Sequence, residues 1–582
     1  MRFFRRFVET PRRRFGTAVL AVLLAGGLVA AGTGSGVGFP FGGKGAAAPD
    51  LVLAGGTILT MDEKRLRARA IAITDDEITA VGSSRAVARL AGPDTQTVDL
   101  RGRTVIPGLV DGHTHAIRGG QTFDQETYWL DVRSLEDALA RLSEAASERQ
   151  PNEWVAVIGS WHPNQFREKR APTVADLTEA SPTNPVYVQY LYDYALVNEA
   201  GIEALGLNAS QTPPVPGIMV ERDANGQATG RLFGGIGPFN ALVGTLLPAT
   251  FAERKDSLEH YFAALNASGV TGFIDDSAGP PASYETLFAL SDEGRLSLRA
   301  GYRVPAQTPG NESAFFESVM AFRAPRQRGG PTPFVGMGES IVFGVNDGVR
   351  MGPGFRATPE ALAELEEVAT LAASRRIPLE IHAYTDDAAS QILDVFERVN
   401  ATYPIGGLRW AMAHLNTGSP ETIARMKALG MAYSVQMGPY FEGPAILEAN
   451  GPDVALRSAA RAALDQGLVV AGGTDATRVG DFRVWPAVEF QVTGASAGNA
   501  VVRPPEQRMT RMEALRTYTL GSAWLAFDDD DRGSLEVGKL ADLAVLDARY
   551  LRIPATRIGE IRSLLTLRGG EAVHDPRGWV TD

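Results

Sequence analysis

The stretch that decides the fold runs from Val105 to His115 and reads VIPGLVDGHTH. This apolar run predicts a buried β-strand that ends in two histidines. Successive side chains of a strand point to opposite faces, so His113 and His115 project to the same side and can hold one metal ion between them. Pro107 marks where an incoming segment stops and the strand begins. A chance histidine pair in a turn is the alternative that this stretch alone leaves open.

Length and composition limit the class of protein. The chain has 582 residues, of which 44% are hydrophobic and 21% charged, as is ordinary for a globular protein. This length predicts two to four domains, or one large barrel with additions. Cysteine is absent, which excludes disulfides and thiolate metal sites. Any metal ion must therefore be held by histidine, aspartate, glutamate or a modified lysine.

The distribution of charge argues against a nucleic-acid partner. The formal net charge is −12, and residues 1–32 contribute +5 through six arginines and one glutamate, so the remainder carries −17. An acidic protein repels the phosphate backbone. We therefore expect a small-molecule substrate, no nucleic acid and no stable membrane partner once a signal is removed. The sequence does not indicate an oligomeric state.

Residues 1–48 have the layout of an export signal followed by a linker. An arginine-rich start precedes an apolar run over residues 16–31, and this run is short for a membrane span, which needs about twenty residues. Val29 and Ala31 suit cleavage, and Arg12–Arg14 is compatible with a twin-arginine route. These features predict a secreted or cell-envelope protein. An uncleaved anchor formed by residues 16–31 is the alternative.

The rest of the chain divides into two patterns. Residues 49–106 and 527–582 show short alternating runs with turn signals such as Gly55-Gly56, and together they predict one composite β-sandwich. Residues 107–526 alternate buried strands with amphipathic helices, which predicts an α/β protein, a deformed (β/α)8 TIM barrel. A segment of about 123–250 interrupts that rhythm and is predicted to cap the barrel mouth. The expected helices cover residues 257–267, 359–374, 387–399, 420–429 and 454–466.

Chemistry-bearing side chains gather at the ends of predicted strands. His113 and His115 end the first strand, His382 and His414 end two later strands, and Asp475 follows another. In a barrel of this type the active site lies at the C-terminal ends of the strands. A single histidine there could be structural or touch the substrate, whereas four with an aspartate indicate a metal centre.

These motifs resemble those of a known family. The segments 107–115, Glu380–Ala383, Ala413-His414 and Gly473–Ala476, with the closing pattern of 533–547, are similar to the amidohydrolase superfamily, in particular its YtcJ-like (amidohydrolase 3) branch. The resemblance covers essentially everything after residue 49. It implies a metal-dependent hydrolase in a deformed TIM barrel with a composite β-sandwich.

The resemblance also predicts the metal. Relatives with two ions bridge them through a carboxylated lysine in the fourth-strand region, and Phe343 stands where that lysine is expected. We therefore expect one divalent ion held by four side chains. Imidazole and carboxylate ligands suit Zn²⁺, although Fe²⁺ and Mn²⁺ remain possible. The expected ligands are His113, His115, His382 and Asp475.

The expected reaction is hydrolysis of a carbon–nitrogen bond other than a peptide bond, in an N-substituted amide, a formamide or a cyclic amide, by a metal-activated water. Asp475 is expected to take the proton of that water and pass it to the leaving nitrogen, while His414 donates a hydrogen bond to the substrate oxygen. A secreted binding protein that lost catalysis and a metal-dependent isomerase or lyase are the alternatives.

Four further residues are expected to touch the substrate. Trp161 and His162 lie in the insert where relatives line the pocket, and Gln436 follows a predicted strand. Tyr194 stands where the branch usually has a histidine, so the substrate of relatives does not transfer directly.

Overall fold

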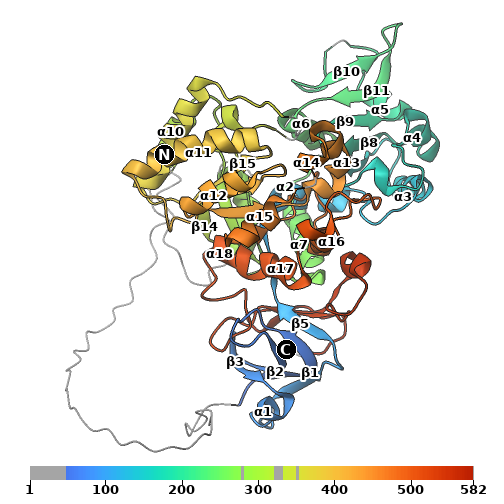
Figure 1. The fold of residues 1–582 in the computed structure, drawn as a ribbon. Helices are drawn as coiled ribbons and strands as arrows, with labels where there is room; N and C mark the ends of the chain where they lie inside the picture. The colour runs from blue at the N-terminus through green and yellow to red at the C-terminus, as the bar shows by residue number, and fades with distance from the viewer. Residues whose placement is uncertain are drawn as a thin grey trace, which may run out of the picture. The chain divides into compact units, whose positions relative to one another are not determined.

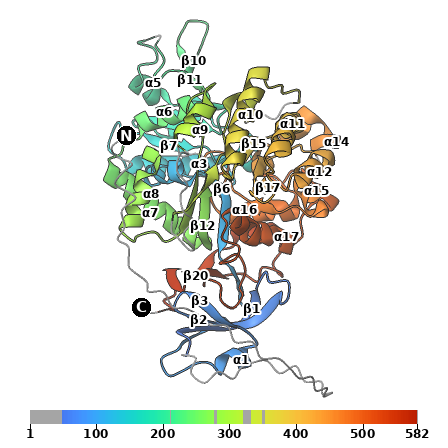
Figure 2. The ribbon, with the colours of Figure 1, turned by 90° about the vertical axis from the view of Figure 1, so that its left-hand side faces the viewer.

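The computed structural model describes residues 48–580 except 211, 277–280, 320–331, 349–352 and 456. The predicted export signal and its cleavage site lie outside the described residues. Within them, no helix is long and apolar enough to cross a membrane. The described residues form one compact unit. Its elements are shown in Figure 1 and, turned by 90°, in Figure 2.

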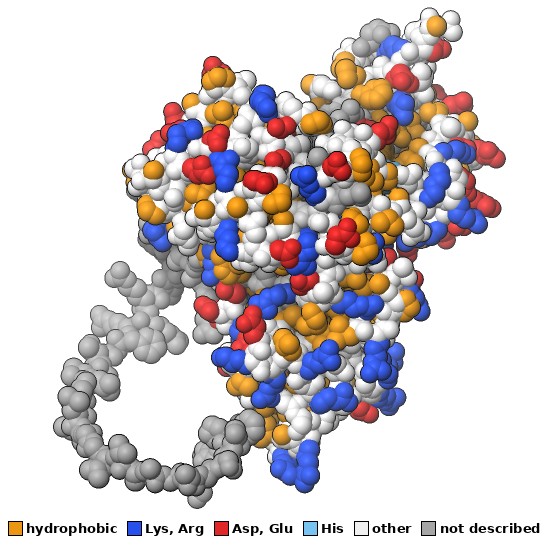
Figure 3. Space-filling model, in the orientation of Figure 1, with side chains coloured by type: hydrophobic (Ala, Val, Ile, Leu, Met, Phe, Trp, Pro, Cys, Tyr) orange, Lys and Arg blue, Asp and Glu red, His pale blue; other side chains and the backbone are white. Residues whose placement is uncertain are grey.

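Both ends of the described chain build one eight-stranded sheet. Its order is β21-β20-β19-β5-β1-β2-β3, with β4 also paired to β1. The antiparallel pairing of β19 with β5, in which Leu543 lies opposite Pro107, joins the two segments. On the face drawn in Figure 3, lysine and arginine side chains gather over this part of the molecule. The strands are β1 (Leu51–Leu59), β2 (Arg67–Thr74), β3 (Glu77–Gly82), β4 (Gln96–Asp99), β5 (Thr104–Pro107), β19 (Leu543–Leu546), β20 (Ser563–Arg568) and β21 (Glu571–His574).

The expected turn at Gly55-Gly56 is wrong, because β1 continues through it. The register of β1 against β2 shifts between Ala54 and Ile58, which is the signature of a bulge. Before the shift β1 pairs with β4, and after it with β5. Gly55 has φ +76°, and a side chain there would collide with Asp99 Oδ1, so the glycine permits the bulge.

Eight parallel strands lie in the middle of the chain, in two sheets of four. The orders are β14-β13-β12-β6 and β15-β16-β17-β18. The structure is therefore mixed α/β, and its strand pairings give two sheets where a single closed sheet was expected. One parallel bridge, Met337 with Leu379, connects the sheets at one side. The strands are β6 (Leu109–Thr114), β12 (Val270–Asp275), β13 (Arg299–Val304), β14 (Phe334–Met337), β15 (Glu380–Ala383), β16 (Ala411–His414), β17 (Ala432–Val435) and β18 (Val470–Gly472).

Helices follow these strands and bury one face against them. Thr250 and Glu253 form a capping box that begins α7, and Thr358 with Pro359 begins α10. The principal helices of this region are α2 (Ala116–Gly120), α7 (Phe251–Ala267), α8 (Glu285–Asp292), α9 (Glu312–Val319), α10 (Pro359–Ser374), α11 (Asp386–Thr402), α12 (Pro420–Ala428), α13 (Gly438–Asn450), α14 (Pro452–Ala455), α15 (Ala459–Gln466), α16 (Val484–Thr493), α17 (Arg511–Arg516) and α18 (Ser522–Leu525).

The insert forms a five-stranded sheet of its own, in the order β10-β11-β9-β8-β7. Two apolar clusters cover its faces, one centred on Tyr187 and Phe239 and the other on Trp129 and Trp161. Its elements are α3 (Leu135–Ser147), β7 (Val155–Ile158), α4 (Val174–Ala180), β8 (Val186–Tyr190), β9 (Tyr194–Val197), α5 (Glu199–Ala204), β10 (Met219–Arg222), β11 (Ala228–Phe233) and α6 (Ile236–Leu246).

Candidate metal centre

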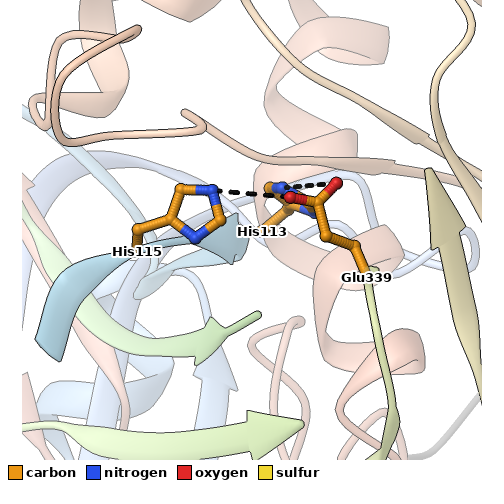
Figure 4. A group of neighbouring side chains, drawn as sticks. All are labelled: His113, His115 and Glu339. Carbon is orange, nitrogen blue, oxygen red and sulfur yellow. Dashed lines mark ion pairs between the residues drawn. The ribbon is translucent and has the colours of Figure 1, made fainter. Parts of the chain in front are cut away.

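His113 and His115 lie at the end of β6 and are buried, with 0% and 5% of their surfaces exposed. Both imidazoles approach the carboxylate of Glu339, as Figure 4 shows. His113 Nε2 lies 3.9 Å from Glu339 Oε2, and His115 Nε2 lies 3.7 Å from Glu339 Oε1. The two-residue spacing therefore places both rings beside one carboxylate.

Glu339 is a central residue of this centre, and the sequence analysis missed it. It follows β14 and is 8% exposed. Its Oε2 lies 2.9 Å from His382 Nδ1 and 2.9 Å from His414 Nε2. The available signal was a short apolar run, Phe334–Met337, that ends beside an acid, the same pattern that identified the other strand ends.

The placement of Phe343 at the expected lysine position is wrong. Phe343 lies in a short 3-10 helix, Phe343–Val345, and is 41% exposed. The residue at the end of the fourth parallel strand is Glu339, whose carboxylate can coordinate a cation. Phe343 therefore gives no reason to expect a single metal ion.

His382 and His414 end β15 and β16, next to each other in the second parallel sheet. Their ring centroids are 4.5 Å apart, and Tyr384 stacks on His414 at 4.6 Å. His414 has φ +69°, a conformation that is costly for a side chain of this size and that persists where surrounding contacts fix it. One such contact is the backbone N–H of His414, which donates to Gln436 Oε1 at 2.6 Å.

Asp475 follows β18 and connects this strand to β6. Its backbone N–H donates to His113 O at 3.0 Å, and its Oδ1 lies 3.0 Å from His115 Nε2 and 3.7 Å from His113 Nε2. The other oxygen, Oδ2, lies 3.7 Å from His414 Nδ1. Asp475 therefore contacts His113 and His115 of the first parallel sheet and His414 of the second.

The donor atoms fall into small groups in which all atoms lie within 4.8 Å of one another. Within the described residues, the four predicted ligands do not form one such group, because His382 groups with Glu339 and His414. The structure does place His113, His115 and His382 within 4 Å of Glu339, and Asp475 beside His113 and His115. The groups are His113, His115 and Glu339; His113, His414 and Asp475; Glu339, His382 and His414; and His113, Asp276 and Glu380.

One buried atom shows that these residues fit a metal ion. His113 Nε2 is inaccessible to solvent and has no hydrogen-bond partner among the described residues, an arrangement that is costly unless something occupies it. The opposite ring atom, His113 Nδ1, lies 2.5 Å from Glu380 Oε1. Histidine ligands of metals characteristically donate their other N–H to a carboxylate in this way.

Behind His113 lies a buried charge network. Arg303 Nη1 lies 2.5 Å from Asp276 Oδ1 and 3.2 Å from Glu380 Oε2. Asp276 Oδ2 lies 3.4 Å from His113 Nδ1, and all of these side chains are at most 3% exposed. Asp275 has a different partner, because its Oδ2 accepts the backbone N–H of Ile117 at 2.9 Å.

Burial and charge shift the pKa values of the centre in opposite directions. Burial alone would raise the pKa of Glu339, but the His113 charge and hydrogen bonds from His382 and His414 hold it well below its usual value. Burial would lower the pKa of His382, whereas bonds to Asp347 and Glu339 raise it to about 10. Burial and the charge of His382 lower the pKa of His414. An ionised Glu339 beside a protonated His382 forms a site where a cation can replace the proton.

The structure gives Trp161 and Gln436 internal partners. Trp161 is fully buried, stacks on Phe166 and donates its Nε1–H to Gln189 O at 2.8 Å. Gln436 is 1% exposed, accepts from His414 N and donates from Nε2 to Ser434 Oγ at 2.8 Å. Both side chains therefore have structural roles, and their contact with substrate stays a prediction.

His162 and Tyr194 lie in the insert and are connected through Tyr190. The His162 and Tyr190 rings are 5.5 Å apart, and those of Tyr190 and Tyr194 are 5.3 Å apart. The Arg231 guanidinium lies 4.1 Å from the Tyr194 ring. His162 Nδ1 accepts the backbone N–H of Asn164 at 2.9 Å. Their contact with substrate also stays a prediction.

Comparison with known proteins identifies the class. The model of the amidohydrolase family (Amidohydro_3) matches residues 96–574, and the chain therefore belongs to this family. It is 26% identical over 555 residues to an N-substituted formamide deformylase of Arthrobacter pascens, covering 89% of this chain and 96% of the relative. It is 25% identical over 557 residues to the putative amidohydrolase YtcJ of Bacillus subtilis, covering 90% of this chain and 98% of the relative.

A solved structure gives the same assignment at the level of the fold. An uncharacterized metal-dependent hydrolase from Pyrococcus furiosus superposes with a TM-score of 0.61 at 22% identity, covering 86% of this chain and 100% of that chain. The resemblance to the YtcJ-like branch is confirmed, as is the prediction of a metal-dependent hydrolase that acts on carbon–nitrogen bonds.

Proposed function

We propose that this enzyme hydrolyses an N-substituted amide, a formamide or a cyclic amide with a metal-activated water. The observation that carries the proposal is the buried His113 Nε2, which has no hydrogen-bond partner among the described residues and faces the carboxylates of Glu339 and Asp475 at 3.9 and 3.7 Å. The formamide activity in the name of one relative supports this substrate class. The substrate is expected to be a small molecule, because the acidic chain does not favour nucleic acid.

We revise the expected metal stoichiometry from one ion to two, because Glu339 belongs to two donor groups. His113 and His115 lie 3.9 and 3.7 Å from its carboxylate oxygens, and His382 and His414 each lie 2.9 Å from Oε2. In this arrangement His414 is a metal ligand, which replaces its expected role toward the substrate oxygen. Zn²⁺ suits these nitrogen and oxygen donors, and so do Fe²⁺ and Mn²⁺. Metal analysis of the purified protein should give two equivalents per chain; one equivalent would restore the single-ion arrangement.

The bound cation would lower the pKa of a coordinated water toward ~7 and polarise the attacked carbonyl. Asp475 acts as the base that takes the proton of the water and passes it to the leaving nitrogen. Burial would raise the pKa of this carboxyl, but the imidazoles of His113 and His115 beside it lower it below its usual range, so the residue is ionised and able to accept a proton at neutral pH.

A substrate panel tests the reaction. Purified protein should release amine from N-substituted formamides or amides, or open a cyclic amide. Asp475→Asn should reduce kcat by about 10²–10⁴-fold, the contribution typical of general acid–base catalysis. Asp465→Asn is the matched control, because Asp465 is exposed and paired with Arg461 on the same helix. Full turnover by Asp475→Asn would exclude the assignment of the base.

We propose that the two parallel sheets are the halves of a deformed (β/α)8 barrel. The bridge between Met337 and Leu379 at one junction supports closure, as does the bond from Asp475 N to His113 O at the other. Residues 107–526 would form this barrel, residues 123–250 its inserted cap, and residues 49–106 with 527–582 the composite domain. An experimental structure with eight continuous strand pairings would support closure, and one with an open gap between β18 and β6 would contradict it.

We propose that the protein is exported, on the basis of residues 1–48. The arginine-rich start and the apolar run over residues 16–31 support a cleaved signal. Fractionation of source cells should place the protein outside the cytosol with an N-terminus after Ala31. Replacement of Arg12 and Arg13 by lysine should block export by a twin-arginine route. Full-length protein in the cytosol would contradict export.

A further inference from the structure

A cavity of about 600 Å³ lies between the start of the barrel region and the insert. Its walls come from α2, which directly follows His115, from α6 and the loop after it, and from the first turns of α7 and α8. Pockets for small molecules usually have volumes of 300–1,000 Å³. None of the proposed metal ligands lines this cavity, so it is separate from the centre described above.

The wall of the cavity carries positive charge that the protein does not neutralise. Arg118 and Arg254 line it, and neither forms an ion pair with any of the described carboxylates. Arg118 Nε is buried without a hydrogen-bond partner in the part of the chain that the structure describes. Arg254 uses Nη1 to bond Ala249 O at 2.8 Å, which leaves its charge in place.

The remaining charged groups of the wall do not cancel these two arginines. Arg478 also lines the cavity, but Glu126 neutralises it, with both carboxylate oxygens 2.7 Å from Nη1. Glu285 is the single carboxylate among the lining residues. The net charge of the wall is therefore positive, and the two partly buried guanidinium groups have no ion-pair partner among the described residues.

Another part of the wall is apolar. Ile117, Val243, Leu247 and Phe251 line it, and Phe251 is 42% exposed. An apolar surface beside uncompensated guanidinium groups matches a molecule with an apolar body and an acidic group. Guanidinium binds carboxylates and phosphates through its planar donors, while the apolar wall favours an organic acid over a bare inorganic anion.

We propose that this cavity binds a small organic carboxylate, with Arg118 and Arg254 as the charge partners and the four apolar residues around its body. The proposal is independent of the reaction at the metal centre. The site is nevertheless adjacent to that centre, because α2 continues from His115 and packs at Gly119 against Thr477. Thr477 lies two residues beyond Asp475.

Calorimetric titration of the full purified chain tests the proposal with three probes. These are benzoate, its neutral amide analogue benzamide, and inorganic phosphate. We expect saturable binding of benzoate and at least about tenfold weaker binding of phosphate. Any benzamide bound at the metal centre should be unaffected by Arg118→Gln or Arg254→Gln. Arg118→Gln and Arg254→Gln should each weaken benzoate binding by at least about tenfold, the loss typical of a charge-assisted hydrogen bond.

Two controls separate this site from the metal centre, which could also take a carboxylate. Arg398→Gln removes an exposed arginine paired with Glu366 and should leave benzoate binding unchanged. Binding that survives both Arg118→Gln and Arg254→Gln would assign benzoate to the metal centre and overturn the proposal. Absence of saturable benzoate binding would also overturn it, as would benzamide binding that the two substitutions weaken as much as they weaken benzoate binding. Unchanged melting temperatures would establish that both variants fold, and either variant alone suffices for the test.

Discussion

At the scale of single residues, the metal centre depends on how His113 is held. Glu380 lies 2.5 Å from His113 Nδ1 and is itself held by Arg303, which directs Nε2 toward Glu339 and Asp475. Glu380→Gln should therefore weaken metal binding by about 10–100-fold, the usual effect of removing a carboxylate behind a histidine ligand. Metal affinity by competition with a fluorescent chelator would measure this.

The matched control for that prediction is Glu366→Gln, which changes an exposed glutamate paired with Arg398. Equal metal affinity in the two variants would show that Glu380 does not position the ligand. The metal-to-protein ratio of Glu380→Gln in excess metal separates a loss of positioning from a loss of folding. If the variant were only less stable and still held His113 correctly, excess metal would restore the wild-type ratio.

His162 gives a prediction about pH. Burial, with the charge of Lys169, lowers its pKa from 6.5 to about 4. The unfolded chain therefore binds the proton more strongly, so stability is lost as the pH falls from about 6.5 to about 4, by at most roughly 3 kcal/mol. His162→Asn keeps an acceptor for the Asn164 N–H and removes the titration. Its melting temperature should fall less between pH 7 and pH 4.5 than that of the wild type, and parallel profiles would contradict this.

The sequence predicted five residues of the centre, because each stands at the end of a recognisable apolar run and the active site of such a barrel lies at the C-terminal ends of its strands. These residues are His113, His115, His382, His414 and Asp475. Glu339 was missed because the lysine pattern of relatives pointed to Phe343, four residues further along the chain. Local sequence does not show which acid near a strand end turns inward. The partners of Trp161 and Gln436 likewise come from distant elements, which spacing does not reveal.

At the scale of elements, the sequence predicts helix boundaries well where a capping residue and a helical repeat of apolar residues mark the same start. The helix expected over residues 359–374 has those bounds, set by Thr358 and Pro359 at its start. The helix expected from residue 257 begins at Phe251, because the capping box of Thr250 and Glu253 adds a polar first turn. The bulge in β1 could not be predicted, because it depends on β4 and β5 pairing to different parts of that strand.

The insert is attached to the loop after β18 by a buried ion pair. Arg478 Nη1 lies 2.7 Å from Glu126, and the two side chains are 2% and 1% exposed. Glu126→Gln would leave a buried guanidinium without its partner, which costs about 3–5 kcal/mol. The midpoint of urea unfolding should fall accordingly. Glu560→Gln, in the exposed pair with Arg557, should change it little, and equal shifts would contradict the role of the buried pair.

At the scale of the whole molecule, the metal centre joins the two parallel sheets. His113, His115 and Glu339 come from the ends of β6 and β14 in one sheet, whereas His382, His414 and Asp475 come from the ends of β15, β16 and β18 in the other. A cation between them would therefore bind the folded arrangement and not the unfolded chain, so metal binding and stability are linked.

Removing the metal should consequently lower the melting temperature of the entire described unit. A ligand present at 100 times its Kd contributes about 2.7 kcal/mol of stability, and protons compete for the same imidazoles, so the contribution should shrink as the pH falls. The measurement is thermal unfolding before chelation, after chelation, and after Zn²⁺ or Mn²⁺ is restored, with metal content determined at each step. His260→Gln, which changes an exposed histidine paired with Asp124, should respond to chelation as the wild type does, whereas His382→Gln should respond less. If the chelated wild type were free of metal but equally stable, the two sheets would be held together without a cation, and the centre would serve chemistry alone.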